Sequence, residues 1–148
     1  MKAVVVTDTS CLIALERVGH LQLLPGLFTV LAPPAVAEEF GRCPDWMTVR
    51  NAPPSPERLV ALDKGESEAI ALALSLPSAT LLIDEARGRA AAARLRLQVT
   101  GTAGVLLKAK RHALLPLVGP VLEELVLEHS FRLSDRLFLA ILERANES

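Results

Sequence analysis

Two acidic residues follow apolar runs that are typical of buried strands. Residues 3–6 read Ala-Val-Val-Val and lead through Thr7 to Asp8, and residues 80–83 read Thr-Leu-Leu-Ile and lead to Asp84. Such uninterrupted runs predict strands buried on both faces, as at the centre of a parallel sheet. The carboxyl ends of central parallel strands meet at one edge, where open α/β sheets place their chemistry. We therefore expect the two carboxylates to lie together.

Two further acids, Glu39 and Glu66, fall on predicted helices that must pack against this sheet. Four converging carboxylates would repel one another, and burial would raise their pKa values. A divalent cation relieves this repulsion, because hard oxygen ligands suit Mg²⁺ or Mn²⁺. Such an ion can bind a scissile phosphate, lower the pKa of an attacking water and stabilise the leaving oxygen. The set predicts a metal site for phosphodiester hydrolysis.

Each acid also has a purely structural interpretation. Asp8 and Asp84 precede predicted helices, where Asp is a good N-cap. Asp63 and Glu66 have the spacing of a capping box, and Glu39 has the position of a solvated helix residue. The recurrence of acids at the ends of buried runs favours a common cause.

Composition and charge limit the class of protein. With 148 residues, 51% of them hydrophobic, and a mean hydropathy of +0.36, the chain suits one α/β domain over residues 1–148. The formal net charge of −1 excludes a global basic field. If nucleic acid is the partner, local Arg and Lys clusters or a metal must hold its phosphates. Aromatic residues make up only 3% of the chain, which argues against a base-stacking platform.

Neither targeting nor zinc binding is expected from the sequence. Cys11 and Cys43 lack the spacing of a zinc site, and Cys11 falls in an apolar helix as a small core residue. The apolar run near the start stops at Thr7 and Asp8, which is too early for a signal peptide. The uncharged stretch 69–83 is shorter than the roughly 20 residues of a membrane span. A cytoplasmic protein is expected.

Strands and helices alternate along the chain, which predicts right-handed βαβ units and a parallel sheet. The expected strands are 3–6, 28–32, 80–83 and 98–100, with a possible strand at 47–50. The expected helices are 10–18, 33–40, 57–62, 65–74, 85–97, 101–112, 120–128 and 134–145. A short helical piece is expected at 20–24, broken by Pro25 and Gly26.

In their order and spacing, several pieces of the chain resemble PIN-domain proteins of the small prokaryotic kind related to the toxin halves of VapBC toxin–antitoxin pairs. The likeness covers nearly the whole chain. The matching pieces are Val-Val-Thr-Asp-Thr-Ser at 5–10, Pro-Ala-Val-Ala-Glu-Glu at 34–39, the stretch 62–73, Leu-Leu-Ile-Asp-Glu at 81–85 with Arg89, Val-Thr-Gly-Thr at 99–102, and the tail 131–134.

The resemblance implies a three-layer α/β/α sandwich with a central parallel sheet and a metal-dependent endoribonuclease. Asp8 matches the first acid of the family, and Ser10 matches a hydroxyl that supports the metal shell. Glu39 matches the second acid, Glu66 the third and Asp84 the fourth. Asp8, Glu66 and Asp84 would bind Mg²⁺ or Mn²⁺. The implied partners are an RNA substrate and a small antitoxin.

Two assignments stay open at this point. Glu66 and Glu68 are two residues apart and point to nearly opposite sides of a helix, so only one can face the site. Glu85 could take the place of Asp84. The third acid is usually Asp in the toxins, and Glu is longer by one methylene. A catalytically weak or inactive PIN-fold binding or regulatory module is therefore the alternative function.

Substrate contacts are expected from two basic clusters, which could hold an RNA backbone or an acidic partner, or could simply be solvated. They are Arg87, Arg89, Arg94 and Arg96 in the first cluster, and Lys108, Lys110 and Arg111 in the second. The Leu- and Val-rich segment 114–127 carries more apolar surface than a small monomer easily hides. A homodimer or a docked antitoxin would cover it.

Overall fold

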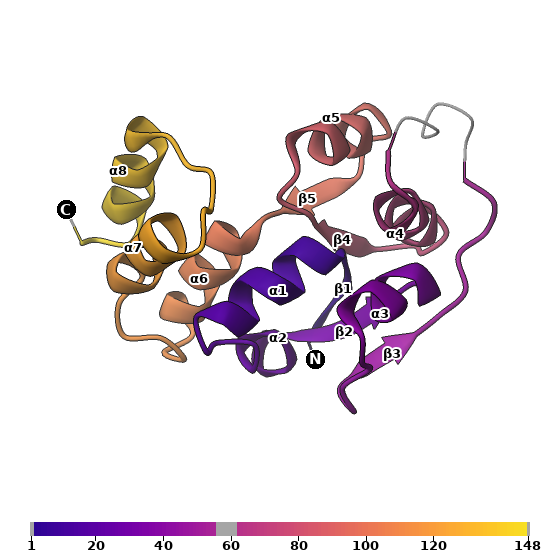
Figure 1. Ribbon diagram of the computed structural model, residues 1–148, viewed down its shortest axis with the longest axis horizontal. Coiled ribbons are helices and arrows are strands. Elements are labelled where there is room, and N and C mark those ends of the chain that lie inside the picture. Colours follow the sequence, from indigo (N-terminus) through magenta and orange to yellow (C-terminus); the bar gives the residue numbers. More distant parts are fainter. Residues whose placement is uncertain (1, 56–61, 148) are drawn as a thin grey trace.

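The computed structural model describes residues 2–55 and 62–147 (Figure 1). Its centre is a parallel sheet with the strand order β3-β2-β1-β4-β5. The strands are β1 (Ala3–Thr7), β2 (Phe28–Ala32), β3 (Met47–Val49), β4 (Ala79–Leu82) and β5 (Gln98–Thr100). The predicted parallel sheet is confirmed, and it includes the short strand expected near residue 47.

Helices cover both faces of this sheet. They are α1 (Thr9–Arg17), α2 (Leu23–Leu27), α3 (Pro34–Phe40), α4 (Lys64–Leu74), α5 (Ala86–Arg94), α6 (Thr102–Arg111), α7 (Gly119–Glu128) and α8 (Asp135–Arg144). One apolar cluster joins the sheet to α1, α2 and α6, and continues into α7 and α8. A second cluster joins the opposite face to α4 and α5. The predicted three-layer α/β/α fold is therefore confirmed.

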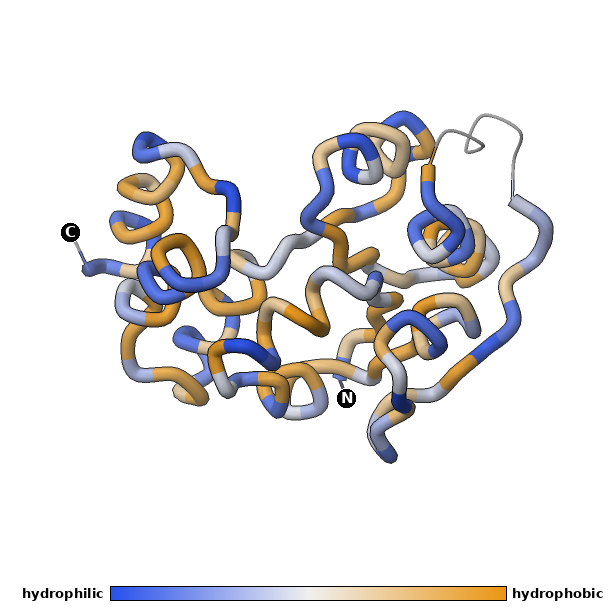
Figure 2. The backbone as a smooth tube through the Cα atoms, in the orientation of Figure 1, coloured by the Kyte–Doolittle hydropathy of each residue, from blue (hydrophilic) through white to orange (hydrophobic). Residues whose placement is uncertain are grey.

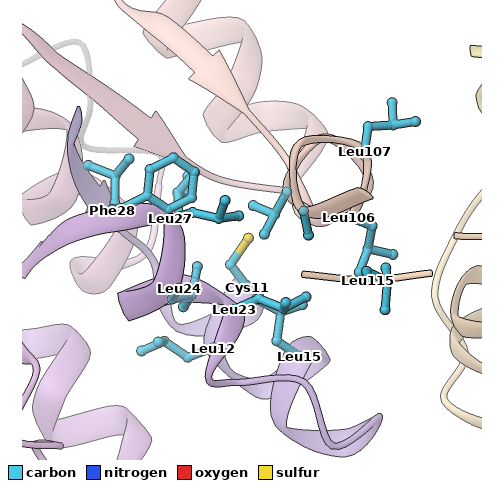
Figure 3. Packing of buried hydrophobic residues seen from close by; sticks show 14 of the residues in the cluster. Cys11, Leu12, Leu15, Leu23, Leu24, Leu27, Phe28, Leu106, Leu107 and Leu115 are labelled. Atoms are coloured by element: carbon cyan, nitrogen blue, oxygen red, sulfur yellow. The ribbon is translucent and has the colours of Figure 1, made fainter. Parts of the chain in front are cut away.

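The apolar runs of β1 and β4 are buried because side chains on alternate positions enter different layers. Val5 and Leu82 belong to the cluster with α1 and α6, whereas Val6 and Leu81 belong to the cluster with α4 and α5. All four side chains are fully buried. Figure 3 shows the first cluster from close by, with Cys11 among leucines of α1, α2 and α6.

Two local predictions were wrong. Helix α2 runs through Pro25 and Gly26 and does not break there. Pro25 lies in the first turn, where its missing N–H is not needed and its fixed φ suits a helix. Helix α5 ends at Arg94, three residues earlier than expected.

A Schellman motif ends α5. Arg96 has a φ of 61°, and Leu97 N–H donates to the carbonyl of Ala92 at 3.1 Å. This left-handed turn is usually marked by glycine, which is absent here. The helix predicted over 57–62 falls almost entirely on 56–61, which lie outside the described residues.

The order of the strands reverses at β1. The chain passes from β1 to β2 and β3 on one side and then places β4 on the other side of β1. In doubly wound sheets ligands bind beyond the carboxyl ends of the strands at this switch point. The two ends are held together there, because the N–H of Asp8 donates to the carbonyl of Leu82 at 3.0 Å. Within the part of the chain described, no helix is long and apolar enough to cross a bilayer.

Candidate carboxylate site

Asp8 follows β1 directly and is the N-cap of α1. Its Oδ1 accepts the backbone N–H of Cys11 at 2.9 Å. Its Oδ2 is buried and has no hydrogen-bond partner within the described residues. The capping interpretation is therefore correct for one oxygen and leaves the other unsatisfied. A buried carboxylate oxygen without a partner is costly, so this oxygen is a candidate ligand atom for a cation.

The surroundings of Asp8 disfavour its charged form. The pKa of Asp8 is raised from 3.8 to about 8, chiefly by burial. The charges of Asp84, Glu66 and Asp63 contribute to this rise, and the N–H of Cys11 opposes it. The acids predicted at the ends of β1 and β4 and at the start of α4 thus act on one another electrostatically. A cation placed among them would favour the ionised form of Asp8.

Glu66 is on α4, is only 9% exposed, and reaches towards α5. A Cβ added to Gly88 of α5 would lie 2.9 Å from Glu66 Oε2. Burial raises the pKa of Glu66 to about 7, with further contributions from the charge of Asp63, a hydrogen bond shared with Asp63, and the charge of Glu85. Asp63 also caps α4 by accepting the N–H of Glu66 at 2.8 Å, as the capping-box interpretation required.

Glu68 faces a different part of the molecule. Its Oε1 accepts the N–H of Ala35 at 3.3 Å, at the start of α3. Of the two glutamates that the sequence left open, Glu66 lies with the other acids and Glu68 does not.

Asp84 does not cap the helix that follows it. The N-cap of α5 is Glu85, which is exposed and whose side chain makes no capping hydrogen bond. Asp84 instead holds the start of α6. Its Oδ1 accepts the N–H of Thr102 at 2.8 Å, and its Oδ2 accepts the hydroxyl of Thr102 at 2.5 Å. Asp84, and not Glu85, is thus fixed at the switch point.

Cys11 and Thr102 were not predicted as members of the site. The Sγ of Cys11 donates to Asp84 Oδ2 at 3.6 Å and lies 3.2 Å from Thr102 Oγ1. Burial raises the pKa of the Cys11 thiol well above its usual value, so the thiol keeps the proton that it donates. Cys11 was interpreted only as a small core residue, and the motif Val-Thr-Gly-Thr at 99–102 carried no assigned role for Thr102.

Glu39 and Ser10 lie at the edges of the group. Glu39 is exposed, and its Oε1 accepts the hydroxyl of Thr9 at 3.2 Å. A Cβ added to Gly65 would lie 2.3 Å from that oxygen and 3.6 Å from Asp63 Oδ1. Glu39 therefore lies beside the start of α4. Ser10 is exposed, and it lines a surface cleft together with Asp84. Among the described residues it makes no hydrogen bond to Asp8.

We expect Thr102→Val to lower the free energy of unfolding by about 1–3 kcal/mol, because it removes the buried hydroxyl that donates to Asp84 Oδ2. Thr102→Ser should keep most of the stability. Thr48→Val, on the exposed side of β3, is the control and should change little. Urea unfolding of the metal-free protein measures all three, and equal losses for Val and Ser would contradict the assigned hydrogen bond.

Carboxylate oxygens suit a hard divalent cation. The Oδ2 of Asp8, which has no hydrogen-bond partner in the described part of the chain, can serve as a ligand atom. As placed, however, no three Asp, Glu, His or Cys side chains of residues 2–55 and 62–147 are grouped closely enough to hold an ion. The acids fit the metal by charge and chemistry, and they would have to draw together around it.

A family model described as PIN domain matches residues 4–147. Comparison with curated proteins finds no match, and comparison with solved structures finds none either. PIN domains are a nuclease fold and typically use divalent metal ions. The match identifies the family and not the toxin-related subgroup. Because it spans nearly the whole chain, the protein belongs to the PIN-domain family.

Proposed function

We propose that the protein is a metal-dependent endoribonuclease. The observation that carries this proposal is the buried Oδ2 of Asp8, which has no hydrogen-bond partner among the described residues and lies in the electrostatic reach of Asp84 and Glu66. A fold that keeps an unsatisfied carboxylate oxygen among other carboxylates gives up stability unless a cation binds there. The position of these acids at the switch point of the sheet supports the same conclusion.

In this proposal Asp8, Glu66 and Asp84 hold Mg²⁺ or Mn²⁺. The bound ion would polarise the scissile phosphate and lower the pKa of the attacking water. The cap on α1 keeps Oδ1 of Asp8 occupied, so Oδ2 is left for the ion. Thr102 and Cys11 keep Asp84 in one orientation by hydrogen bonds to its oxygens.

Glu39 has a different part in the proposal. It is the exposed member of the set and is held by the hydroxyl of Thr9. We propose that it lies on the solvent side and accepts a proton from the attacking water. Ser10, exposed in the same cleft, would support the water shell of the ion.

The test is cleavage of a labelled RNA by the purified protein with Mn²⁺, with EDTA as the blank. We expect Glu66→Gln to lower the rate by about 100-fold or more, because it removes an anionic ligand. Glu68→Gln is the matched control on the same helix and should cleave at nearly the parental rate. Equal rates for the parent and Glu66→Gln would refute the proposed site.

The second candidate function is a PIN-fold binding or regulatory module with little turnover. Two observations favour it: the third acid is Glu in place of Asp, and within the described part of the chain no three ligand side chains are grouped closely enough for an ion. A calorimetric titration in which Mn²⁺ does not bind would decide for this function.

The toxin-like role and its partners are also proposals, supported by the resemblance and by exposed apolar side chains. Figure 2 shows hydrophobic and hydrophilic segments alternating along α7 and α8. The exposed leucines of these helices and of the segment before α7 are Leu114, Leu117, Leu127, Leu137 and Leu139. A second copy of the chain, or a small antitoxin encoded by a neighbouring reading frame, would cover them. Light scattering of the purified protein would detect a homodimer. Co-purification with the product of the neighbouring reading frame would detect the antitoxin.

A further inference from the structure

A large cleft opens beside the carboxylate site. Its volume is about 1210 Å³, and Asp84 and Ser10 are among the residues that line it. The lining comes from α5 and β5 on one side, from α7, α8 and their connection on the other, and from α1 and α6. Figure 1 shows α1 and α6 lying between α5 and the pair α7 and α8. The cleft thus leads from the acids to the C-terminal helices.

The charges in this cleft are unlike those of the chain as a whole. The chain has a net charge of −1, with 16 Lys and Arg against 17 Asp and Glu. The acids of the lining are Asp84 and Glu85. Its lysines and arginines are Arg17, Arg89, Lys108, Arg111, Arg132 and Arg144. The cleft is therefore locally basic, with its negative charge confined to the end at the carboxylate site.

These basic side chains make no ion pair within the described part of the chain. The Lys and Arg ion pairs of the described residues are Arg42 with Glu16 and Lys110 with Glu147, and neither basic member lines the cleft. Unpaired cations gathered in one cleft repel one another, and a bound polyanion would relieve that repulsion. Lys110, which the sequence grouped with Lys108 and Arg111, is instead held by the C-terminal segment.

The cations continue from the acids to the far end of the cleft. A Cβ added to Gly101 would lie 2.6 Å from Asp84 Oδ1 and 2.9 Å from Arg89 Nη1, so both side chains flank this glycine. Lys108 is held over the ring of Phe28, with 4.7 Å between Nζ and the ring centroid. Arg132 and Arg144 come from the C-terminal helices and their connection.

We propose that this basic cleft binds a single strand of RNA, with one phosphate at the carboxylates and the following phosphates along α6 towards Arg132 and Arg144. The choice of ligand rests on the proposed nuclease function. Charge complementarity favours it, because a row of cations that begins at a hydrolytic centre matches a chain of phosphates. The contacts are to the backbone, so binding should depend on salt and little on sequence.

Binding of a fluorescein-labelled 20-nucleotide RNA, measured by anisotropy in EDTA so that no cleavage occurs, tests the inference. We expect the double variant Arg132→Ala/Arg144→Ala to bind about tenfold more weakly. Its slope of log K against log salt should be smaller by about 1.4, since each phosphate contact to a single strand contributes about 0.7. The control is Arg136→Ala, an exposed arginine of α8 that does not line the cleft, and it should bind as the parent does.

The outcomes separate this inference from the proposed function. Hydrolysis of a small phosphodiester, bis(p-nitrophenyl) phosphate, by the parent with Mn²⁺ reports the carboxylate site alone. If the parent does not hydrolyse the small phosphodiester and the double variant still binds RNA more weakly than the parent, the proposed nuclease function is refuted and the proposed RNA-binding cleft is supported. If the double variant binds RNA as Arg136→Ala does, the cleft proposal is overturned. Binding of a poly-glutamate peptide in place of RNA would overturn it too, in favour of an acidic protein partner.

Discussion

Asp8→Asn should lose metal-dependent RNA cleavage by about 1000-fold or more and still fold as stably as the parent. The activity falls because a neutral amide replaces the anionic oxygen that the ion needs. The stability is kept because Asn is as good an N-cap as Asp and can accept the N–H of Cys11 as Asp8 does. At pH 8 the variant should even be more stable, since one buried charge near Asp84 and Glu66 is removed.

Asp8→Ala is the matched comparison. It also removes the ligand, so its activity should be equally low, but it removes the cap of α1 and should cost about 1 kcal/mol in the free energy of unfolding. Cleavage rates with Mn²⁺ and urea unfolding in EDTA measure both effects. Near-parental cleavage by the Asn variant would exclude Asp8 as a ligand, whatever its effect on stability.

The second large effect concerns pH. The pKa of Asp8 is raised from 3.8 to about 8 and that of Glu66 from 4.5 to about 7, in both cases chiefly by burial. Between the ordinary and the raised value, the folded protein holds a proton that the unfolded chain has released. The stability of the metal-free protein should therefore fall as the pH rises from about 4 to 8, and lose nothing further from these groups above that range.

The loss between pH 5 and 8.5 should amount to several kcal/mol, because both acids contribute and each pKa unit corresponds to about 1.4 kcal/mol. Asp8→Asn should remove most of this slope. Mn²⁺ should remove it as well, because the ion favours the ionised acids, and its binding at pH 7 should release protons. Calorimetry in two buffers of different ionisation enthalpy counts those protons. A flat profile of stability against pH in EDTA would contradict the electrostatic description of the site.

The sheet could be predicted from the sequence because burial on both faces leaves a strong local signal. Val4, Val5 and Val6 have no polar neighbour to interrupt them, since helices cover both sides of β1. The end of α5 carried no comparable signal, because Arg96 adopts a left-handed conformation that is normally marked by glycine. The proline in α2 gave a misleading signal, because its effect depends on its position within the first turn.

The site was predictable only in part, for a related reason. The convergence of Asp8 and Asp84 follows from two buried strands at a switch point. The choice between Glu66 and Glu68 did not follow, because both sides of α4 are apolar; the contact of Glu68 with Ala35 makes the difference. The hydrogen bond from Cys11 to Asp84 joins residues 73 positions apart, and no local pattern contains such a contact.

Gly65 has a consequence for how relatives of this protein should be interpreted. Alanine is a better helix former than glycine. A methyl group at this place on α4 would collide with the far end of the Glu39 side chain and would lie 3.6 Å from Asp63 Oδ1. A single codon change there would give a sound fold, with every acid still present in the sequence but with Glu39 displaced. Counting carboxylates in an alignment would classify such a protein as intact. The residue at this position should therefore be compared together with the acids, because it sets the room that is left for the Glu39 side chain.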